Sequence, residues 1–198
     1  MHFHVKPSNV QLSNTLYTSG GIIYRQGDAA GALYRVTFGC VIQSKVNRNG
    51  TRQVAGFFLP GELFGWEIED ERLYSAECAG TTIIQTIEPA AAEQLPEWKQ
   101  GRLVPSLGQL QEQLLILSRP TAEARVAAFL HNLLCRQSSR RRVFLPMHRF
   151  DIADYLGLSP ETVSRVLRRF KQSALINTPN IHTVDILKID DLVETYNK

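Results

Sequence analysis

Long apolar runs are absent from this sequence of 198 residues. No stretch approaches the roughly 18 consecutive apolar residues that indicate a membrane-spanning helix. The N-terminal sequence MHFHVKPSNV also lacks the charged and apolar regions of a signal peptide. Internal repeats and low-complexity segments are missing as well. These absences predict a cytoplasmic protein with no membrane partner.

Cysteine is scarce. The chain has three cysteines, Cys40, Cys78 and Cys135, which are far apart and form no CxxC pair. An odd number of separated cysteines is typical of reduced thiols in a cytosol. Because an iron–sulfur cluster requires about four nearby thiolate ligands, we expect none here. Cys40 and Cys78 lie in strand-like runs and are expected to be small buried hydrophobic residues.

Histidine is absent from residues 14–119. An enzyme built on a cupin-like barrel usually holds its metal with two or three histidines and a carboxylate. A barrel without histidine cannot supply such ligands. The sequence therefore argues against an enzyme and against a bound metal.

The first part of the chain, residues 14–89, has the pattern of β-strands. Its runs GGIIYRQGD, ALYRVTFGCVIQSKV and RQVAGFFL are rich in β-branched and aromatic residues, and glycines punctuate them at short intervals. This pattern predicts an antiparallel barrel or jelly roll rather than βαβ units. Asn49-Gly50 is expected to form a hairpin turn between two of the strands.

Two short helices joined by a tight turn are predicted in the stretch FDIADYLGLSPETVSRVLRRF. The first covers residues 149–156 and ends at Gly157, because glycine accepts the left-handed conformation that a sharp helix exit needs. Ser159 is a good N-cap for the second helix, and Pro160 suits its first position. The second helix is expected over about residues 160–173.

The spacing within this stretch is typical of a DNA-binding helix-turn-helix. Ala153 is small where the helices approach, Gly157 lies at the turn, and Val163 lies on the inner face of the second helix. An ordinary helical hairpin has no need of this spacing. The surrounding segment Arg136–Lys171 also has 9 basic residues against 3 acidic ones. A basic segment that coincides with the motif is the expected footprint of phosphate binding.

The segments that flank the motif predict a winged version of it. Thr121 can cap a helix with the sequence TAEARVAAFLHNLLCRQ, and residues 143–146 form a short strand before the motif. After it, residues 177–180 are expected to form a turn, and residues 183–187 alternate like an edge strand. The final stretch IDDLVETYN is expected to form a short terminal helix.

A helix is also predicted over residues 103–119. Its leucines at spacings of 3, 4 and 3 indicate a coiled-coil seam about two heptads long; they are Leu107, Leu110, Leu114 and Leu117. Two interpretations are open, a dimer seam or an apolar face packed on the chain's own barrel. We favour the seam, because a helix-turn-helix usually reads a two-fold DNA site as a dimer.

The order of barrel, leucine-seam helix and winged helix-turn-helix resembles the CRP/FNR family of bacterial transcription regulators. The resemblance covers nearly the whole chain and includes GGIIYRQGDAAGALYRVTFGCV, FFLPGELFGWE and SRPTAEARVAAFL. The most specific match, LGLSPETVSRVLRRF, is similar to the FNR and FixK branch. CRP-type members carry an arginine at the position of Pro160 and a glycine at that of Ser164.

The resemblance implies an α+β fold in three parts. Residues 1–102 would form an antiparallel β-roll of the cupin-like, cyclic-nucleotide-binding type. Residues 103–119 would form a long dimerisation helix, and residues 120–198 a winged helix-turn-helix domain. The implied function is a homodimeric transcription regulator, an activator in most members, that binds double-stranded DNA and RNA polymerase.

The same resemblance assigns DNA contacts. Glu161, Ser164 and Arg165 are expected to read bases in an FNR-like palindrome, TTGAT-N4-ATCAA. Their chemistry agrees, since arginine can donate two hydrogen bonds to a guanine edge, glutamate can accept from a cytosine amino group, and serine can contact a base edge or a thymine methyl. The expected phosphate contacts are Thr162, Arg168, Arg169 and Arg149.

Control by a small molecule is a separate question. CRP-type members hold cyclic AMP with a Gly-Glu pair and a later Arg-Ser-Ala. Here Glu62 is present, but Arg72 is not adjacent to Ser75. We therefore expect Glu62 and Arg72 to form a surface pair, with no obligatory cofactor, as in FixK-type members. The alternative is a ligand-gated regulator whose β-roll binds a cyclic nucleotide, with Glu62, Arg72 and Ser75 as the candidate effector site, or binds haem through His2 and His4.

Overall fold

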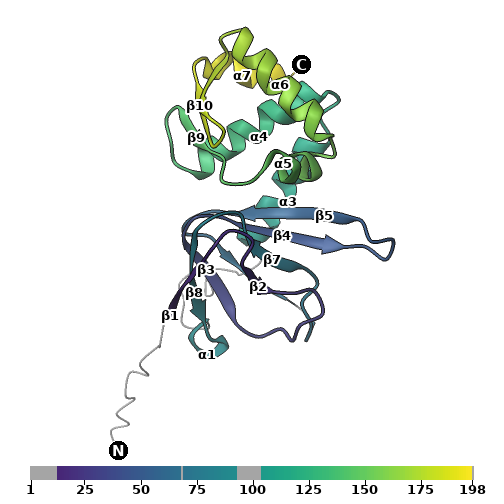
Figure 1. Ribbon diagram of the computed structural model, residues 1–198, viewed down its shortest axis with the longest axis vertical. Helices are drawn as coiled ribbons and strands as arrows, with labels where there is room; N and C mark the ends of the chain where they lie inside the picture. Colours follow the sequence, from purple (N-terminus) through teal and green to yellow (C-terminus); the bar gives the residue numbers. More distant parts are fainter. Residues whose placement is uncertain (1–12, 68, 93–103, 198) are drawn as a thin grey trace, which may run out of the picture.

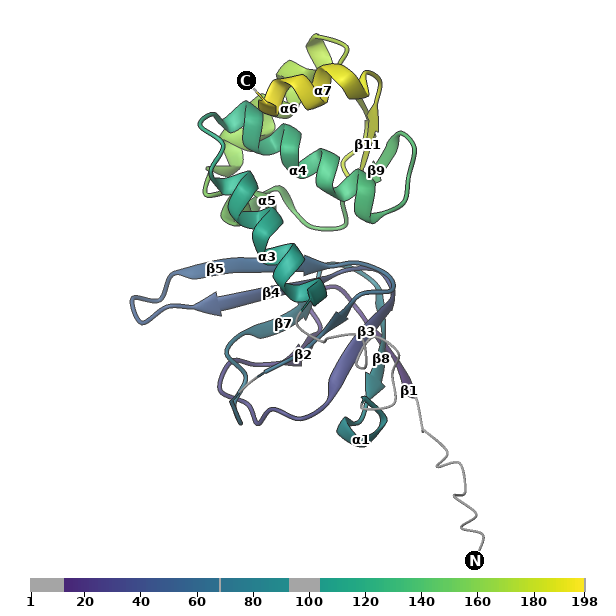
Figure 2. The same ribbon diagram turned by 180° about the vertical axis from the view of Figure 1, so that it is seen from behind.

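The computed structural model describes residues 13–67, 69–92 and 104–197, which form two bodies (Figure 1). The lower body in that view is a roll of β-strands, and the upper body consists of helices with a small sheet. Helix α3 (Val104–Leu117) runs between the two bodies, as the view from behind shows (Figure 2). No helix in this described part is long and apolar enough to cross a membrane.

The β-roll is built from two antiparallel sheets. Its strands are β1 (Ser13–Tyr17), β2 (Ile22–Tyr24), β3 (Leu33–Phe38), β4 (Val41–Val46), β5 (Arg52–Phe58), β6 (Leu63–Phe64), β7 (Ser75–Cys78) and β8 (Thr82–Ile87). One sheet has the order β1-β8-β3-β6 and the other β2-β7-β4-β5. All of these pairs are antiparallel. The predicted antiparallel roll is therefore confirmed.

The β4–β5 hairpin shows how local sequence fixes this sheet. The predicted turn at Asn49-Gly50 is confirmed, and Gly50 has a φ of 80°, a left-handed conformation that glycine adopts without strain. Side chains alternate along the strands. Val41 and Phe58 therefore point into the roll, whereas Phe57 points towards the helical body.

The helical body follows the predicted order. Its elements, with the short helix that precedes α3, are α1 (Pro89–Ala92), α4 (Ala122–Arg136), β9 (Arg142–Phe144), α5 (Arg149–Leu156), α6 (Pro160–Gln172), β10 (Ile176–Asn180), β11 (Thr183–Ile186) and α7 (Ile189–Asn197). Thr121 caps α4 as predicted, since its hydroxyl accepts a hydrogen bond from the N–H of Ala124 at 3.0 Å. The predicted terminal helix is confirmed as α7.

The wing differs from the prediction in two respects. Its sheet has the order β10-β11-β9, so β11 is the central strand and not an edge strand. The predicted turn at residues 177–180 is wrong, because these residues belong to β10. Pro179 lies on the outer strand, where its missing N–H leaves no ladder bond unmade. The reversal comes at Ile181-His182, where the Asn180 side chain accepts a hydrogen bond from the His182 N–H at 2.9 Å.

The cysteines lie as expected. Cys40 and Cys78 are buried, and Cys135 is exposed on α4. Burial raises the pKa of the Cys78 thiol to about 11 and also raises that of Cys40. Both buried thiols are therefore protonated at neutral pH and behave as small hydrophobic side chains.

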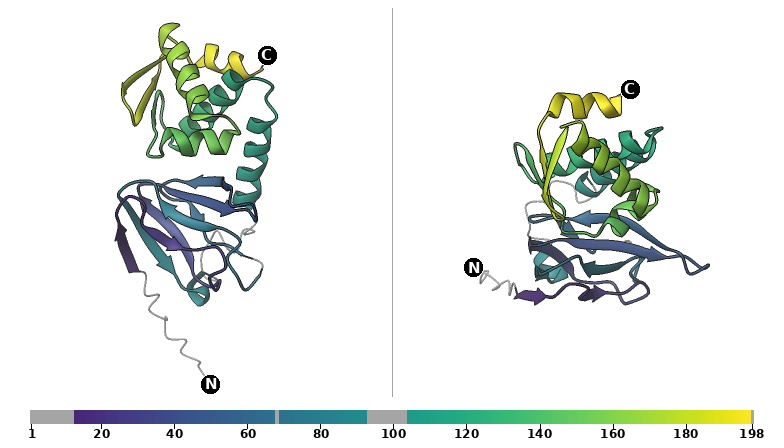
Figure 3. Two further views of the ribbon diagram at one scale, coloured as in Figure 1. Left: turned by 45° about the vertical axis from the view of Figure 1, so that its right-hand side comes forward. Right: turned by 45° about the horizontal axis from the view of Figure 1, so that its top comes forward.

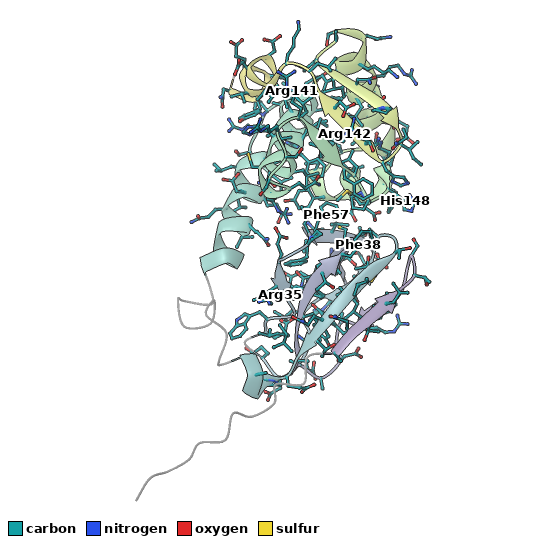
Figure 4. All side chains as sticks on the ribbon, turned by 90° about the vertical axis from the view of Figure 1, so that its left-hand side faces the viewer. Arg35, Phe38, Phe57, Arg141, Arg142 and His148 are labelled. Carbon is teal, nitrogen blue, oxygen red and sulfur yellow. The ribbon has the colours of Figure 1, made fainter. Side chains whose placement is uncertain are left out.

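The helical body rests on the sheet that contains β4 and β5 (Figure 3). The Phe57 ring lies at the boundary (Figure 4) and contacts Tyr155 of α5 and Phe129 of α4, with ring centroids 5.0 and 6.1 Å apart. Buried residues from both bodies form one continuous apolar cluster there. The predicted helix-turn-helix is therefore packed directly on the β-roll.

Candidate DNA-binding site

The predicted helix-turn-helix is present as α5 and α6. Gly157 ends α5 with φ 62° and ψ 41°, the left-handed conformation predicted for it. Ser159 caps α6, because its hydroxyl accepts a hydrogen bond from the N–H of Thr162 at 3.1 Å. Pro160 occupies the first turn. The turn residues in the sequence therefore determine where α5 ends and where α6 begins.

Helix α6 has two opposite faces. Its apolar face is buried against the domain core and consists of Val163, Val166, Leu167 and Phe170. Its other face is exposed and carries Glu161, Ser164, Arg165, Arg168 and Arg169. Packing of the first face holds the second towards solvent, which is the arrangement that a recognition helix requires.

The three predicted base-reading residues lie together on this exposed face. Hydrogen bonds with its own backbone and with Ser159 lower the pKa of Glu161, so its carboxylate is ionised and acts as a hydrogen-bond acceptor. Arg165 has one weak intramolecular contact, from Nη2 to the Thr162 hydroxyl at 3.4 Å. Ser164 is exposed. The helix thus presents an acceptor, a hydroxyl and a guanidinium within one turn.

The predicted phosphate contacts occupy different surroundings. Arg168 is exposed and makes no ion pair within the described residues, whereas Arg169 pairs with Glu123 of α4 at 2.5 Å. The Thr162 hydroxyl lies 3.1 Å from that of Ser159. Arg149 is half-buried, and its Nη2 donates to the carbonyl of Ile181 in the wing turn at 3.1 Å.

Burial lowers the pKa of Arg149. Its contact with the wing turn places its guanidinium between α5 and the wing rather than on the face of α6. Its expected contact with a DNA phosphate stays a prediction. Arg168 is the better candidate on geometry, because its charge is exposed on the recognition helix itself.

The expected surface pair between Glu62 and Arg72 is wrong. Glu62 instead pairs with Arg136 of α4, with Oε1–Nε and Oε2–Nη2 distances of 2.9 and 2.7 Å. Arg72 is only 3% exposed. Its guanidinium lies over the ring of Tyr24, 4.4 Å from the centroid. The prediction failed because Arg136 is 74 positions from Glu62, and no local pattern joins them.

The other contacts of the suspected effector site are also internal. Arg72 donates to the backbone carbonyls of Gly65 and Ala32. The Ser75 hydroxyl accepts from the N–H of Gln26 at 2.9 Å. Glu62, Arg72 and Ser75 therefore each bind a different part of the chain. His2 and His4, the suggested haem ligands, lie outside the described residues.

A cavity of about 610 Å³ lies between the β-roll and α3. Its lining combines apolar, aromatic and charged side chains and includes Lys45, Phe57, Glu62, Tyr74, Glu112 and Arg136. The ammonium group of Lys45 lies over the Tyr74 ring, 5.9 Å from its centroid. Pockets of 300–1,000 Å³ commonly hold small ligands. The volume therefore suits a small molecule.

Helix α3 leaves leucine side chains in solvent. Leu110 and Leu114 are 51% and 59% exposed, whereas Ile116 is buried against the helical body. Leu117 is half-buried. Leu107 lies in α3, but its side chain is outside the described part. The chain's own barrel does not cover Leu110 and Leu114, which favours the seam interpretation of this helix.

Some ion pairs between the β-roll and the helical body could not be recognised from the sequence. Arg52 of β5 contacts Asp151 and Asp154 of α5, about 100 positions away. Arg136 reaches Glu62 in the same way. Each of these side chains follows an ordinary strand or helix pattern. A partner so distant in sequence cannot be identified from the periodicity of either element.

Two family models match the chain. Residues 15–96 match the cyclic nucleotide-binding domain, and residues 124–195 match the Crp-like helix-turn-helix domain. The first covers the β-roll, and the second covers the helical body after α3. The two models thus match in the order that the fold shows.

Named relatives agree with these matches. The chain is 38% identical to the nitrogen fixation regulation protein FixK of Rhizobium meliloti (strain 1021) over 176 residues, which cover 89% of this chain and 83% of that protein. It is 35% identical to the transcriptional activator protein anr of Pseudomonas aeruginosa, covering 86% and 76% of the two chains. The structure of FixK2 from Bradyrhizobium japonicum superposes with a TM-score of 0.84 at 28% identity, covering 93% of this chain and 96% of that one.

Proposed function

The chain belongs to the CRP/FNR family of bacterial transcription regulators, in its FNR/FixK branch, and we propose that it activates transcription from an FNR-like palindrome, TTGAT-N4-ATCAA. The observation that carries the proposal is the exposed face of α6. Glu161, Ser164 and Arg165 lie there side by side, with few intramolecular contacts. Relatives with regulator names are consistent with a DNA-binding protein and not an enzyme.

Each base-reading side chain has a role in this proposal. Arg165 donates two hydrogen bonds to the half-site guanine, and Glu161 accepts from a cytosine amino group. Ser164 contacts a base edge or a thymine methyl. A good bidentate contact contributes about 1–3 kcal/mol of discrimination against the wrong base. Phosphate contacts, assigned to Thr162, Arg168, Arg169 and Arg149, add affinity but no sequence preference.

The proposed active form is a homodimer. A palindrome has two-fold symmetry, and a dimer matches it with one α6 for each half-site. The exposed side chains of Leu110 and Leu114 support α3 as the seam. Leu107 and Leu117 extend the same heptad pattern. A symmetric pair of α3 helices would cover these leucines and remove their apolar surface from water.

We propose that DNA binding needs no obligatory effector. The residues of the candidate effector site are engaged elsewhere, since Glu62 pairs with Arg136 and Arg72 is buried against Tyr24. A cyclic nucleotide would have to break these contacts to use them. The same proposal includes contact with RNA polymerase and a location in the cytoplasm, where a bacterial activator meets its DNA.

The cavity beside α3 supports a second candidate function. A ligand-gated regulator would bind a small molecule there, such as a cyclic nucleotide, and switch its affinity for DNA. The volume of about 610 Å³ and the charged side chains of Lys45 and Glu112 favour this alternative. The two candidates differ in one respect, whether the protein binds its palindrome without ligand.

A fluorescence anisotropy titration separates them. Protein purified without added ligand is titrated into a labelled TTGAT-N4-ATCAA duplex and into a scrambled duplex, both at one fixed salt concentration because affinity depends on salt. Nanomolar, selective binding supports effector-independent recognition. Equal weak binding to both duplexes contradicts it. Repeating the titration with cyclic nucleotides, with haem and under strict anaerobiosis then tests the ligand-gated alternative.

A further inference from the structure

Arg52 belongs to the β-roll and connects it to the helix-turn-helix. It begins β5, the edge strand of its sheet. Its guanidinium meets carboxylates from two directions: Glu77 of β7 at 2.5 Å, and Asp151 and Asp154 of α5 at 3.1 and 3.5 Å. Arg52 therefore joins a strand of the roll to the first helix of the helix-turn-helix.

The two aspartates are also tied to the backbone. Asp154 Oδ2 accepts a hydrogen bond from the N–H of Val54 on β5 at 3.1 Å. Asp151 Oδ2 accepts from the N–H of His148 at 3.1 Å and caps the start of α5. Asp151 thus fixes the start of α5, and Asp154 fixes the contact of α5 with the strand. Arg52 supplies the positive charge that they share.

Asp151 and Asp154 need the positive charge of Arg52 because their side chains are largely buried. The side chains of Asp151 and Asp154 are only 9% and 17% exposed, and burial raises the pKa of Asp154. Two carboxylates this close repel each other when no cation lies between them. Removing the guanidinium would leave partly buried charges without compensation, and the helix could relieve them by moving away from β5.

We propose that Arg52 is a positioning residue for DNA recognition, one that acts through Asp151 and Asp154 to fix the orientation of α6 relative to the β-roll and α3. The inference rests on the proposed function as a palindrome-binding dimer. In a dimer, the two recognition helices must be about 34 Å apart to enter successive major grooves. If α6 changes its orientation relative to the β-roll, this spacing is lost although the exposed face of α6 is unchanged.

The docked orientation is compatible with binding. Glu161, Ser164 and Arg165 are exposed while the Arg52 contacts are made. The contacts of Arg52 with Asp151 and Asp154 therefore leave the DNA-binding face of α6 free. Phe57 and Tyr155 also hold the two bodies together through an apolar contact. Loss of Arg52 should thus loosen the orientation without separating the bodies or unfolding either one.

The test compares Arg52→Ala and Arg52→Lys with a matched control, Arg48→Ala. Arg48 is exposed in the same hairpin and makes no ion pair within the described residues. Each variant is titrated into the full palindrome and into a duplex in which one half-site is scrambled. We expect Arg52→Ala to weaken palindrome binding by about tenfold or more, with a much smaller change on the single half-site.

Lysine should restore part of this loss, because it keeps one charge but cannot reach three carboxylates at once. Arg48→Ala should match the wild type. Combining Arg52→Ala with Asp154→Ala should cost no more than the larger single loss, because the two residues act through one contact. Unchanged palindrome binding by Arg52→Ala would overturn the proposal, and so would an equal loss on both duplexes, which indicates general damage.

Hydrogen exchange of the free protein gives a second readout that needs no DNA. Arg52→Ala should speed exchange at Val54 and across residues 149–156 while β8 keeps its wild-type rates. An increase in exchange throughout the protein would contradict a positioning role, and so would an unchanged exchange rate at α5. If the wild type fails to prefer the palindrome, the proposed function fails, and the exchange result still decides whether Arg52 holds α5.

Discussion

Replacement of Arg165 by alanine tests base reading most directly. The side chain is exposed on α6, and its intramolecular contact is the weak one to Thr162 at 3.4 Å. Alanine is also a better helix former than arginine. We therefore expect the free energy of unfolding to change by no more than about 0.5 kcal/mol. Any large change in DNA binding then comes from the lost contact and not from the fold.

The expected loss follows from the chemistry of one bidentate contact. Arg165 to a guanine edge contributes about 1–3 kcal/mol of discrimination, which is roughly a 5- to 150-fold preference over another base. Wild-type protein should show this preference when the guanine of one half-site is replaced. The Arg165→Ala variant should bind the original and the substituted duplex equally. Its affinity should be about that of the wild type for a duplex in which the guanines of both half-sites are replaced, because both subunits of the dimer lose the contact.

The assay is anisotropy on both duplexes at several salt concentrations. Arg168→Ala is the matched control, since Arg168 is exposed on the same helix. It should weaken binding to both duplexes by the same factor and lower the salt dependence by about one phosphate contact per subunit. An Arg165→Ala variant that retained the wild-type preference for guanine would refute the assignment.

Other substitutions test the remaining parts of the proposal. Leu114→Glu should convert the proposed dimer to a folded monomer in light scattering, because Leu114 is 59% exposed in the single chain and would be buried in the seam. Leu16→Glu, at a position 66% exposed on β1, should remain dimeric; a dimeric Leu114→Glu protein would exclude the α3 seam. Glu62→Ala should lower the free energy of unfolding by about 1–3 kcal/mol in urea denaturation, because it leaves Arg136 without its carboxylate partner in a site that is mostly buried; no change would show that the pair contributes nothing to stability. Cys135 should be the one thiol among the three that reacts with a thiol reagent in folded protein, since the other two are buried; rapid reaction of all three would contradict that burial.

Local chemistry made the helix-turn-helix predictable. Gly157, Ser159 and Pro160 each favour one backbone conformation, and together they fix where α5 ends and α6 begins. The same kind of signal misled at the wing. Pro179 and Asn180 both favour turns, but the chain reverses one residue later because Asn180 acts as the start of the turn and Pro179 fits an outer strand.

Contacts between the two bodies could not be predicted, because no repeat or spacing records them. Glu62 shows the difference. We expected Glu62 to form a surface pair with Arg72, whereas the structure gives it Arg136 as a partner. An ion pair between distant elements depends on how the bodies dock. That docking follows from the burial of rings such as Phe57 and Tyr155, which the sequence marks only as apolar.

The cavity and the contacts that join the two bodies share residues, so a ligand in the cavity would act directly on the docking of the bodies. Phe57, Glu62, Arg136 and Tyr155 line the cavity and also join the β-roll to the helical body. A ligand can shift an orientation only by as much as its affinities for the two states differ. A molecule in this cavity would touch the docking residues themselves, so it would have that differential affinity. Suppose that the ligand-free protein already binds its palindrome selectively. The Glu62–Arg136 pair then already holds the helical body in the orientation that binds DNA. A cavity ligand that displaces this pair would weaken DNA binding and would not strengthen it.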